Sequence, residues 1–125
     1  AELVASCRER GGASAHLAEG LAPEAGHFHL LKPKHSAFRA TALPILLQQL
    51  GVEQLAITGI ATDSCVLATA LDAHMRGYRL WVPGDCTAAR TPALQQAAMH
   101  LLRYTCGAEV ATSRGRRHPF GLGRG

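Results

Sequence analysis

The feature that most constrains this chain is the alternation of short apolar runs with segments that carry helix start and stop signals. The apolar runs have the length of strands and cover residues 28–31, 55–60, 80–82 and, more weakly, 109–112. The helical patterns cover residues 2–10, 41–50, 64–76 and 92–106. Strands that alternate with helices indicate a parallel sheet with helices on both faces. We therefore expect an α/β fold with three layers (α/β/α) and a doubly wound parallel sheet.

The boundaries of the predicted helices carry residues that helix termini prefer. A glycine follows the last turn of all four patterns, where it can take the left-handed backbone that ends a helix. Thr91 and Pro92 suit the N-cap and the first helical position, and Thr41 is a capping residue ahead of Pro44. The run LAITGI at 55–60 has almost no polar alternation, which predicts a central strand.

The charge pattern does not indicate a nucleic-acid-binding protein. The formal net charge is +4, but four of the 13 basic residues lie in the Gly-rich tail at 114–125, so the rest of the chain has as many basic as acidic residues. We expect one domain over residues 1–113 and a disordered basic tail without a specific partner. Because no stretch approaches the roughly 18 apolar residues of a spanning helix, we expect no membrane partner either.

The cysteines do not form a recognisable metal or disulfide pattern. They are Cys7, Cys65, Cys86 and Cys106, without a C-x-x-C pair. In a chain this apolar we expect free thiols, which suggests a reducing cytoplasm. We expect no metal and no cofactor.

Two residues follow predicted strands at the edge where open α/β sheets place their chemistry. Lys32 follows the first apolar run, and Cys65 follows the second, within the first turn of the next helix. There the helix dipole favours the reactive thiolate, and a nearby ammonium would favour it further. Gly59 permits a sharp bend before that helix, and Thr62 or Asp63 is expected to cap it. From placement alone, the alternative is a buried Cys65 that only packs.

The residues around both positions resemble the isochorismatase-like cysteine hydrolases, a superfamily that includes nicotinamidases and carbamoyl-amide hydrolases. The resemblance runs from about residue 20 to about residue 112 and rests on KPKHSAF at 32–38, GIATDSC at 59–65 and DCTAA at 85–89, in the order and spacing of the family. It implies the isochorismatase fold and hydrolysis of a small amide or related C–N bond.

The resemblance also implies which residues act. It implies a triad of Asp, Lys and Cys, whose lysine is Lys32 and whose nucleophile is Cys65. It places a cis peptide bond at Ile60–Ala61, and an oxyanion hole at the backbone N–H groups of Ala61 and Cys65. The implied mechanism is attack of the Cys65 thiolate on a carbonyl, formation of a thioester, departure of the amine and hydrolysis.

One element of the family pattern is missing. The aspartate of the family follows the first strand, well upstream of the lysine, yet no Asp precedes Asp63 in this chain. The resemblance therefore implies that the first strand, and roughly the first third of a family member, are absent. We expect impaired catalysis for that reason.

Several weaker signals have plainer interpretations. His27 and His29 are two residues apart, so on a strand they would face the same side and could bind a metal ion together. We expect them instead to be ordinary residues at the edge of the sheet. His35 could replace the missing base, although we favour a surface or pocket-lining role. Asp63 is expected to cap the following helix rather than to take the proton of Cys65. Asp85 is expected to have a structural role.

The leading function is thus a cysteine hydrolase that acts on a small amide-type substrate, as a homo-oligomer. The alternative is a catalytically inactive relative that serves as a binding or oligomerisation module. A redox protein that uses Cys65 is disfavoured because no resolving cysteine lies nearby in the sequence. Hydrolysis of a vinyl ether is also less favoured, because that reaction does not need this cysteine.

Overall fold

The computed structural model describes residues 12–115 and residue 120 of the 125-residue chain. The predicted helix at 2–10 and most of the tail at 114–125 lie outside the described residues. In chain order the elements are α2 (Gly12–Gly20), α3 (Leu43–Gln49), β1 (Gln54–Ala56), β2 (Gly59–Ile60), a π-helical turn (Thr62–Val66), α4 (Leu67–Met75), β3 (Arg79–Trp81), a 3₁₀ turn (Gly84–Cys86), β4 (Thr87–Ala88) and α5 (Pro92–Tyr104). None of the described helices is long and apolar enough to cross a membrane.

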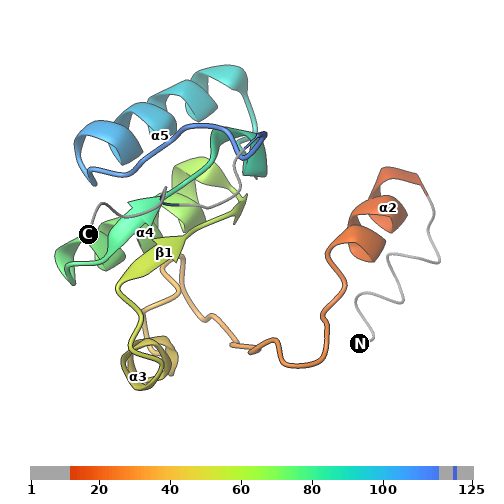
Figure 1. Ribbon diagram of the computed structural model, residues 1–125. Coiled ribbons are helices and arrows are strands. Elements are labelled where there is room, and N and C mark those ends of the chain that lie inside the picture. Colours follow the sequence, from red (N-terminus) through yellow and green to blue (C-terminus); the bar gives the residue numbers. More distant parts are fainter. Residues whose placement is uncertain (1–11, 116–119, 121–125) are drawn as a thin grey trace.

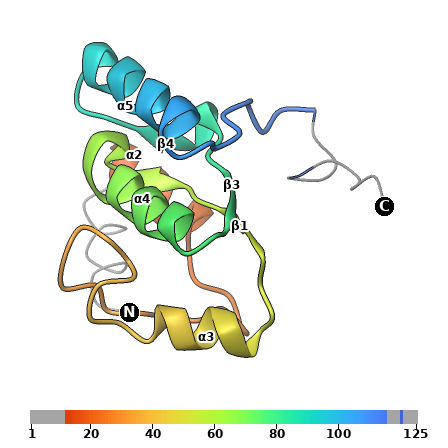
Figure 2. The same ribbon diagram turned by 90° about the vertical axis from the view of Figure 1, so that its left-hand side faces the viewer.

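The strands pair in parallel, as the alternation of strands and helices predicts. β1 pairs with β3, with Leu55 opposite Leu80, and β2 pairs with β4. A parallel bridge between Trp81 and Glu109 extends the first pair. The helices α4 and α5 lie on the same side of β1 and β3 (Figure 2), as expected of successive right-handed crossovers between neighbouring parallel strands.

The predicted strand at 28–31 is wrong. This segment is an extended connection between α2 and the rest of the described chain, and Figure 1 shows α2 standing apart at its far end. Phe28 is 65% exposed and Leu31 is 97% exposed. An apolar run becomes a strand only where another strand offers it hydrogen bonds, and the described residues offer none here.

Among the residues that the structure describes, the predicted central strand at 55–60 is divided, and each part has a partner strand on one side only. Its residues form β1 and β2, and the backbone bends at Gly59, where φ is +115°. Within the described part of the chain, β1 pairs only with β3 and β2 only with β4. Ile60 is consequently 76% exposed, whereas a central strand would bury it.

The helices agree better with their sequence signals. α5 begins as predicted, with Thr91 Oγ1 accepting a hydrogen bond from the Leu94 N–H at 3.2 Å. α3 begins two residues later than predicted, and Thr41 Oγ1 accepts from the Leu43 N–H at 3.2 Å. α2 begins at Gly12 and was not predicted from the sequence.

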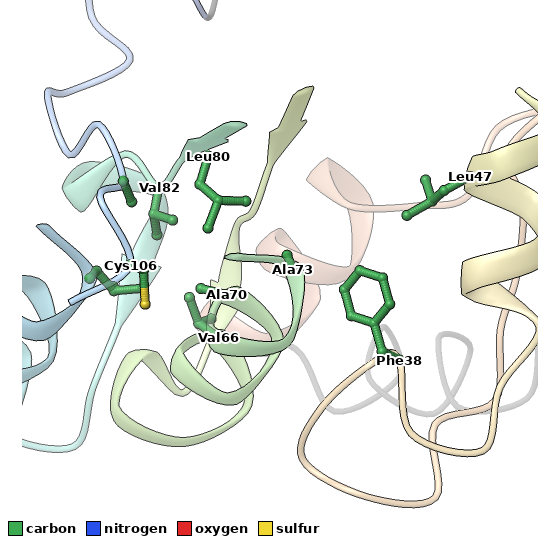
Figure 3. Close-up of a cluster of buried hydrophobic side chains, with 10 residues drawn as sticks. Phe38, Leu47, Val66, Ala70, Ala73, Leu80, Val82 and Cys106 are labelled. Carbon is green, nitrogen blue, oxygen red and sulfur yellow. The ribbon is translucent and has the colours of Figure 1, made fainter. Parts of the chain in front are cut away.

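The core lies between the strands and the helices α4 and α5. Val82 of the chain after β3 and Leu102 of α5 are completely buried, together with Ala70 and Ala73 of α4. Small residues on α4 let the helix approach the strands closely, and Figure 3 shows them between Leu80 and Phe38. Phe38 extends this core to the loop that precedes α3.

Asp85 has the structural role that was predicted for it. Its carboxylate accepts hydrogen bonds from the backbone N–H and the hydroxyl of Ser113, both at 2.8 Å. The bond from the Ser113 backbone contributes most to lowering the pKa of Asp85 below its ordinary value, and the bond from the Ser113 hydroxyl lowers it further, against an opposing effect of desolvation. The carboxylate thus ties the segment after Glu109 to the 3₁₀ turn.

Asp85→Asn is expected to make unfolding easier at neutral pH. Because the pKa of Asp85 is lowered in the folded state, its stabilising effect is present above the ordinary carboxyl pKa and is lost as pH falls through the lowered value. The difference in melting temperature between wild type and Asp85→Asn should therefore be larger at pH 7 than at pH 2–3. Asp72→Asn, which removes a carboxylate paired with Arg76 on the surface of α4, is the control. An equal difference at both pH values would contradict the assignment.

Candidate active site

Cys65 lies in an irregular turn where β2 gives way to α4. The turn is π-helical, with the Val66 N–H donating to the carbonyl of Ala61 at 3.2 Å, five residues back. Such turns are rare and often occur at functional sites. The sequence predicted an ordinary first helical turn from residue 64; the structure starts the α-helix only at Leu67. Cys65 is partly exposed at the start of this helix.

Two side chains from a distant loop reach the Cys65 sulfur. Lys32 Nζ donates to Cys65 Sγ at 3.4 Å and to the carbonyl of Lys34 at 2.8 Å. His35 Nδ1 lies 3.4 Å from the same sulfur. The two side chains of Lys32 and Cys65 are in contact, as the sequence predicted, but Lys32 does not follow a strand, because the predicted strand at 28–31 does not form.

The three residues after His35 fix this loop to α4. The Ala37 N–H donates to Thr69 Oγ1 of α4 at 3.0 Å. Ser36 is buried, and its hydroxyl accepts from the Phe38 N–H at 3.2 Å. The Phe38 ring is 4% exposed and packs in the core. The S-A-F segment therefore holds His35 and Lys32 above the turn that carries Cys65.

The surroundings of Cys65 favour its thiolate form. The hydrogen bond with His35 contributes most to lowering the pKa of the Cys65 thiol, and Lys32 and Ser64 lower it further, against an opposing effect of partial burial. In contrast, burial raises the pKa of Cys106, which is 2% exposed in the core. Of these two thiols, Cys65 is the one prepared to act as a nucleophile.

Neither residue that was expected to cap the helix does so. No side chain caps the turn at its N-terminus. Thr62 is completely buried, and its hydroxyl donates to Gln95 Oε1 of α5 at 2.6 Å. Gln95 in turn donates to Thr87 Oγ1 of β4 at 3.3 Å. Asp63 Oδ1 is buried without a hydrogen-bond partner. Hydrogen bonds thus link the turn to α5 and, through Gln95, to β4. The residues of the turn gave no sign of these contacts.

The backbone before Cys65 has the form that the resemblance implied. The Ile60–Ala61 peptide bond is cis. Ala61 itself is extended, with φ −90° and ψ 145°. Ala61 thus immediately precedes the short π-helical turn that contains Cys65.

Other candidate sites have less support. His27 Nδ1 accepts from the backbone N–H of Glu24, and the described residues hold no group of three or more His, Cys, Asp or Glu side chains that could bind a metal ion. A hollow of about 640 Å³ lies at the amino ends of β1 and β3, between Glu53, Arg76 and Arg79. Open α/β sheets bind their substrates at the carboxyl ends of the strands, where Cys65 lies. We therefore place the candidate site at Cys65 and not at this hollow.

Comparison with known proteins identifies the family of this chain. The model of the isochorismatase domain family matches residues 1–115, a longer stretch than the one on which the sequence resemblance rested. The chain belongs to the isochorismatase family. It is 44% identical over 92 residues to the uncharacterised isochorismatase family protein YaaI of Bacillus subtilis, which covers 74% of this chain and 51% of that protein.

Solved structures support the same family fold. The nicotinamidase PncA of Bacillus subtilis superposes with a TM-score of 0.70 at 29% identity, over 81% of this chain and 56% of that one. The N-carbamoylsarcosine amidase of Thermoplasma acidophilum superposes with a TM-score of 0.69 at 33% identity, over 77% and 54% of the two chains. The predicted α/β isochorismatase fold is confirmed. The chain spans about half the length of each of these three relatives.

Two side chains make contacts that the sequence did not predict. His35 was favoured as a surface or pocket-lining residue, yet its ring contacts the sulfur as closely as Lys32 does. Phe120 was assigned to a disordered tail, but its ring packs edge-on against Trp81, with the ring centres 6.5 Å apart. The motif KPKHSAF contained the signal for His35, because it places an imidazole between the lysine and the buried Ser36 and Phe38.

Proposed function

We propose that this protein is a cysteine hydrolase that cleaves a small amide or related C–N bond through a thioester on Cys65. The observation that carries the proposal is the contact of the Cys65 sulfur with Lys32 and His35, at the carboxyl end of a strand. Membership of the isochorismatase family, and likeness to a nicotinamidase and to an N-carbamoylsarcosine amidase, support the choice of an amide substrate.

In the proposed mechanism the Cys65 thiolate attacks the carbonyl carbon of the amide. The Lys32 ammonium stabilises the thiolate before the attack, because it donates to the sulfur. The N–H groups of Ala61 and Cys65 stabilise the negative oxygen of the tetrahedral intermediate. The C–N bond then breaks, the amine leaves with a proton, and water hydrolyses the thioester.

We further propose that turnover by this chain is slow. In the described residues no carboxylate makes a hydrogen bond with Cys65, which leaves the expected triad aspartate without a counterpart there. Proton transfer by a well-placed acid or base typically contributes about 10²- to 10⁴-fold. The alternative of an inactive binding module predicts that Cys65 forms no acyl-enzyme with an activated ester or amide. That the protein forms a homo-oligomer and resides in the cytoplasm stays a prediction.

Cys65 is expected to be the first of the four thiols to react with a limiting amount of iodoacetamide at pH 7. A larger thiolate fraction makes it the better nucleophile, and Cys106 is buried with a raised pKa. Mass spectrometry of the digested protein measures the labelled fraction at each cysteine. Urea-unfolded protein, in which all four thiols should react at similar rates, is the control. Faster labelling of Cys7, Cys86 or Cys106 in the folded protein would overturn the assignment of the nucleophile.

A further inference from the structure

A base for the Cys65 thiol can be sought among the groups that contact its sulfur. Lys32 donates to the sulfur and to the carbonyl of Lys34. An ammonium carries three N–H donors and no acceptor. Lys32 is therefore suited to stabilise the thiolate and is not suited to receive the proton.

The imidazole of His35 differs from the Lys32 ammonium because it can offer a nitrogen that accepts a hydrogen bond. A neutral imidazole carries an unprotonated ring nitrogen, and Nδ1 of His35 lies 3.4 Å from Cys65 Sγ, within the range of a hydrogen bond to sulfur. The two contacts are complementary, because the sulfur accepts from Lys32 while its S–H can donate to His35. The loop cannot easily move away, since Phe38 is buried and the Ala37 N–H is bound to Thr69.

We propose that His35 is a catalytic residue of this protein: its Nδ1 takes the proton of the Cys65 thiol and later gives it to the leaving amine. This inference rests on the proposed function and assigns its base. The S–H proton moves to Nδ1, and the sulfur electron pair forms the S–C bond. When the C–N bond breaks, its electron pair stays on nitrogen, which receives the proton from Nδ1. Water then loses a proton to Nδ1 as it attacks the thioester, and Cys65 leaves as the thiolate.

Other charged groups lie near His35 and Cys65, and the experiment must separate their effect on the reactivity of Cys65 from that of the His35 imidazole. Lys32 contacts the same sulfur, and Lys34 precedes His35 in the chain. Asp63 lies two residues before Cys65, with its Oδ1 atom buried and without a hydrogen-bond partner. All three remain in a variant changed only at position 35, so the difference between the variant and the wild type reports the imidazole alone.

The decisive experiment is the rate of Cys65 alkylation by iodoacetamide from pH 5 to pH 10, resolved by mass spectrometry, in wild type and His35→Asn. Asparagine can keep a hydrogen bond near the sulfur but cannot take up a proton. We expect the midpoint of the profile to move to higher pH in His35→Asn, with about a tenfold slower reaction at pH 6.5 for each unit of movement. His29→Gln, which removes another exposed imidazole of the same connecting segment, should keep the wild-type profile.

A second variant tests proton transfer itself. In His35→Ala, free imidazole in solution should restore formation of the Cys65 acyl-enzyme from p-nitrophenyl acetate, in proportion to its concentration, and N-methylated imidazolium should not. A profile identical in His35→Asn and wild type, or an absence of rescue in a variant with a wild-type melting temperature, would overturn the proposal. A His35-dependent alkylation profile without any acyl-enzyme would refute the hydrolase function while leaving His35 as the proton acceptor.

Discussion

Replacing Cys65 by alanine is expected to abolish formation of an acyl-enzyme. With p-nitrophenyl acetate, the wild type should release a burst of about one nitrophenol per chain and then continue slowly, because acylation outruns hydrolysis of the thioester. Cys65→Ala should show no burst, and its steady rate should fall on the order of 10³-fold or more. An enzyme with a complete triad would lose a larger factor in rate on the same substitution. Here the rate of the wild type is already limited by the proposed lack of the aspartate. Rapid mixing with absorbance detection measures both phases, and mass spectrometry identifies the acylated residue.

The matched control is Cys86→Ala. Cys86 is also a partly exposed free thiol, and it lies beside Asp85 rather than beside Lys32. This variant should keep the burst of the wild type. A burst that survives in Cys65→Ala would show that another group is acylated, and the proposed mechanism would then be wrong.

Leu102→Ala is expected to give the largest loss of stability among single changes in α5. Leu102 is completely buried in the core between this helix and the strands. Removing its side chain loses apolar contacts and leaves a cavity, which costs about 2–5 kcal/mol in the free energy of unfolding. Urea denaturation followed by circular dichroism measures this change.

The neighbouring residue provides the control. Leu101 has the same side chain on the same helix but is 44% exposed. Leu101→Ala should change the free energy of unfolding much less, by about 1 kcal/mol or below, because the shortened side chain loses few contacts. Similar losses in the two variants would contradict the position of α5 in the structure.

Local signals in the sequence determined most of the helices. Thr91, Pro92 and the glycine at 107 act on neighbouring backbone, so the start of α5 was predicted correctly and its end to within two residues. The alternation of helices with apolar runs was likewise sufficient to predict a parallel α/β fold. Family motifs then pointed to Lys32 and Cys65, and the two side chains do meet.

Strands were predicted less well, because a strand depends on a partner that its own residues do not specify. Residues 28–31 are as apolar as a strand requires, yet they find no partner in the described chain and stay exposed. The run at 55–60 was expected at the centre of a sheet, but within the described residues β1 has a partner strand on one side only, and the backbone bends at Gly59. Apolarity measures a preference for burial, and the position within a sheet is decided by the strands that happen to be adjacent.

The sequence by itself therefore predicted α3, α4 and α5, the fold class and Cys65 as the candidate nucleophile, although it did not predict α2. The signals for these features lie close together in the chain. Only the tertiary structure decided what surrounds that nucleophile. His35 and Cys65 are 30 residues apart, and Thr62 and Gln95 are 33 apart. Neither pair has a local pattern that indicates contact. Burial of Phe38 against α4 brings the first pair together, and packing of α5 beside the π-helical turn brings the second.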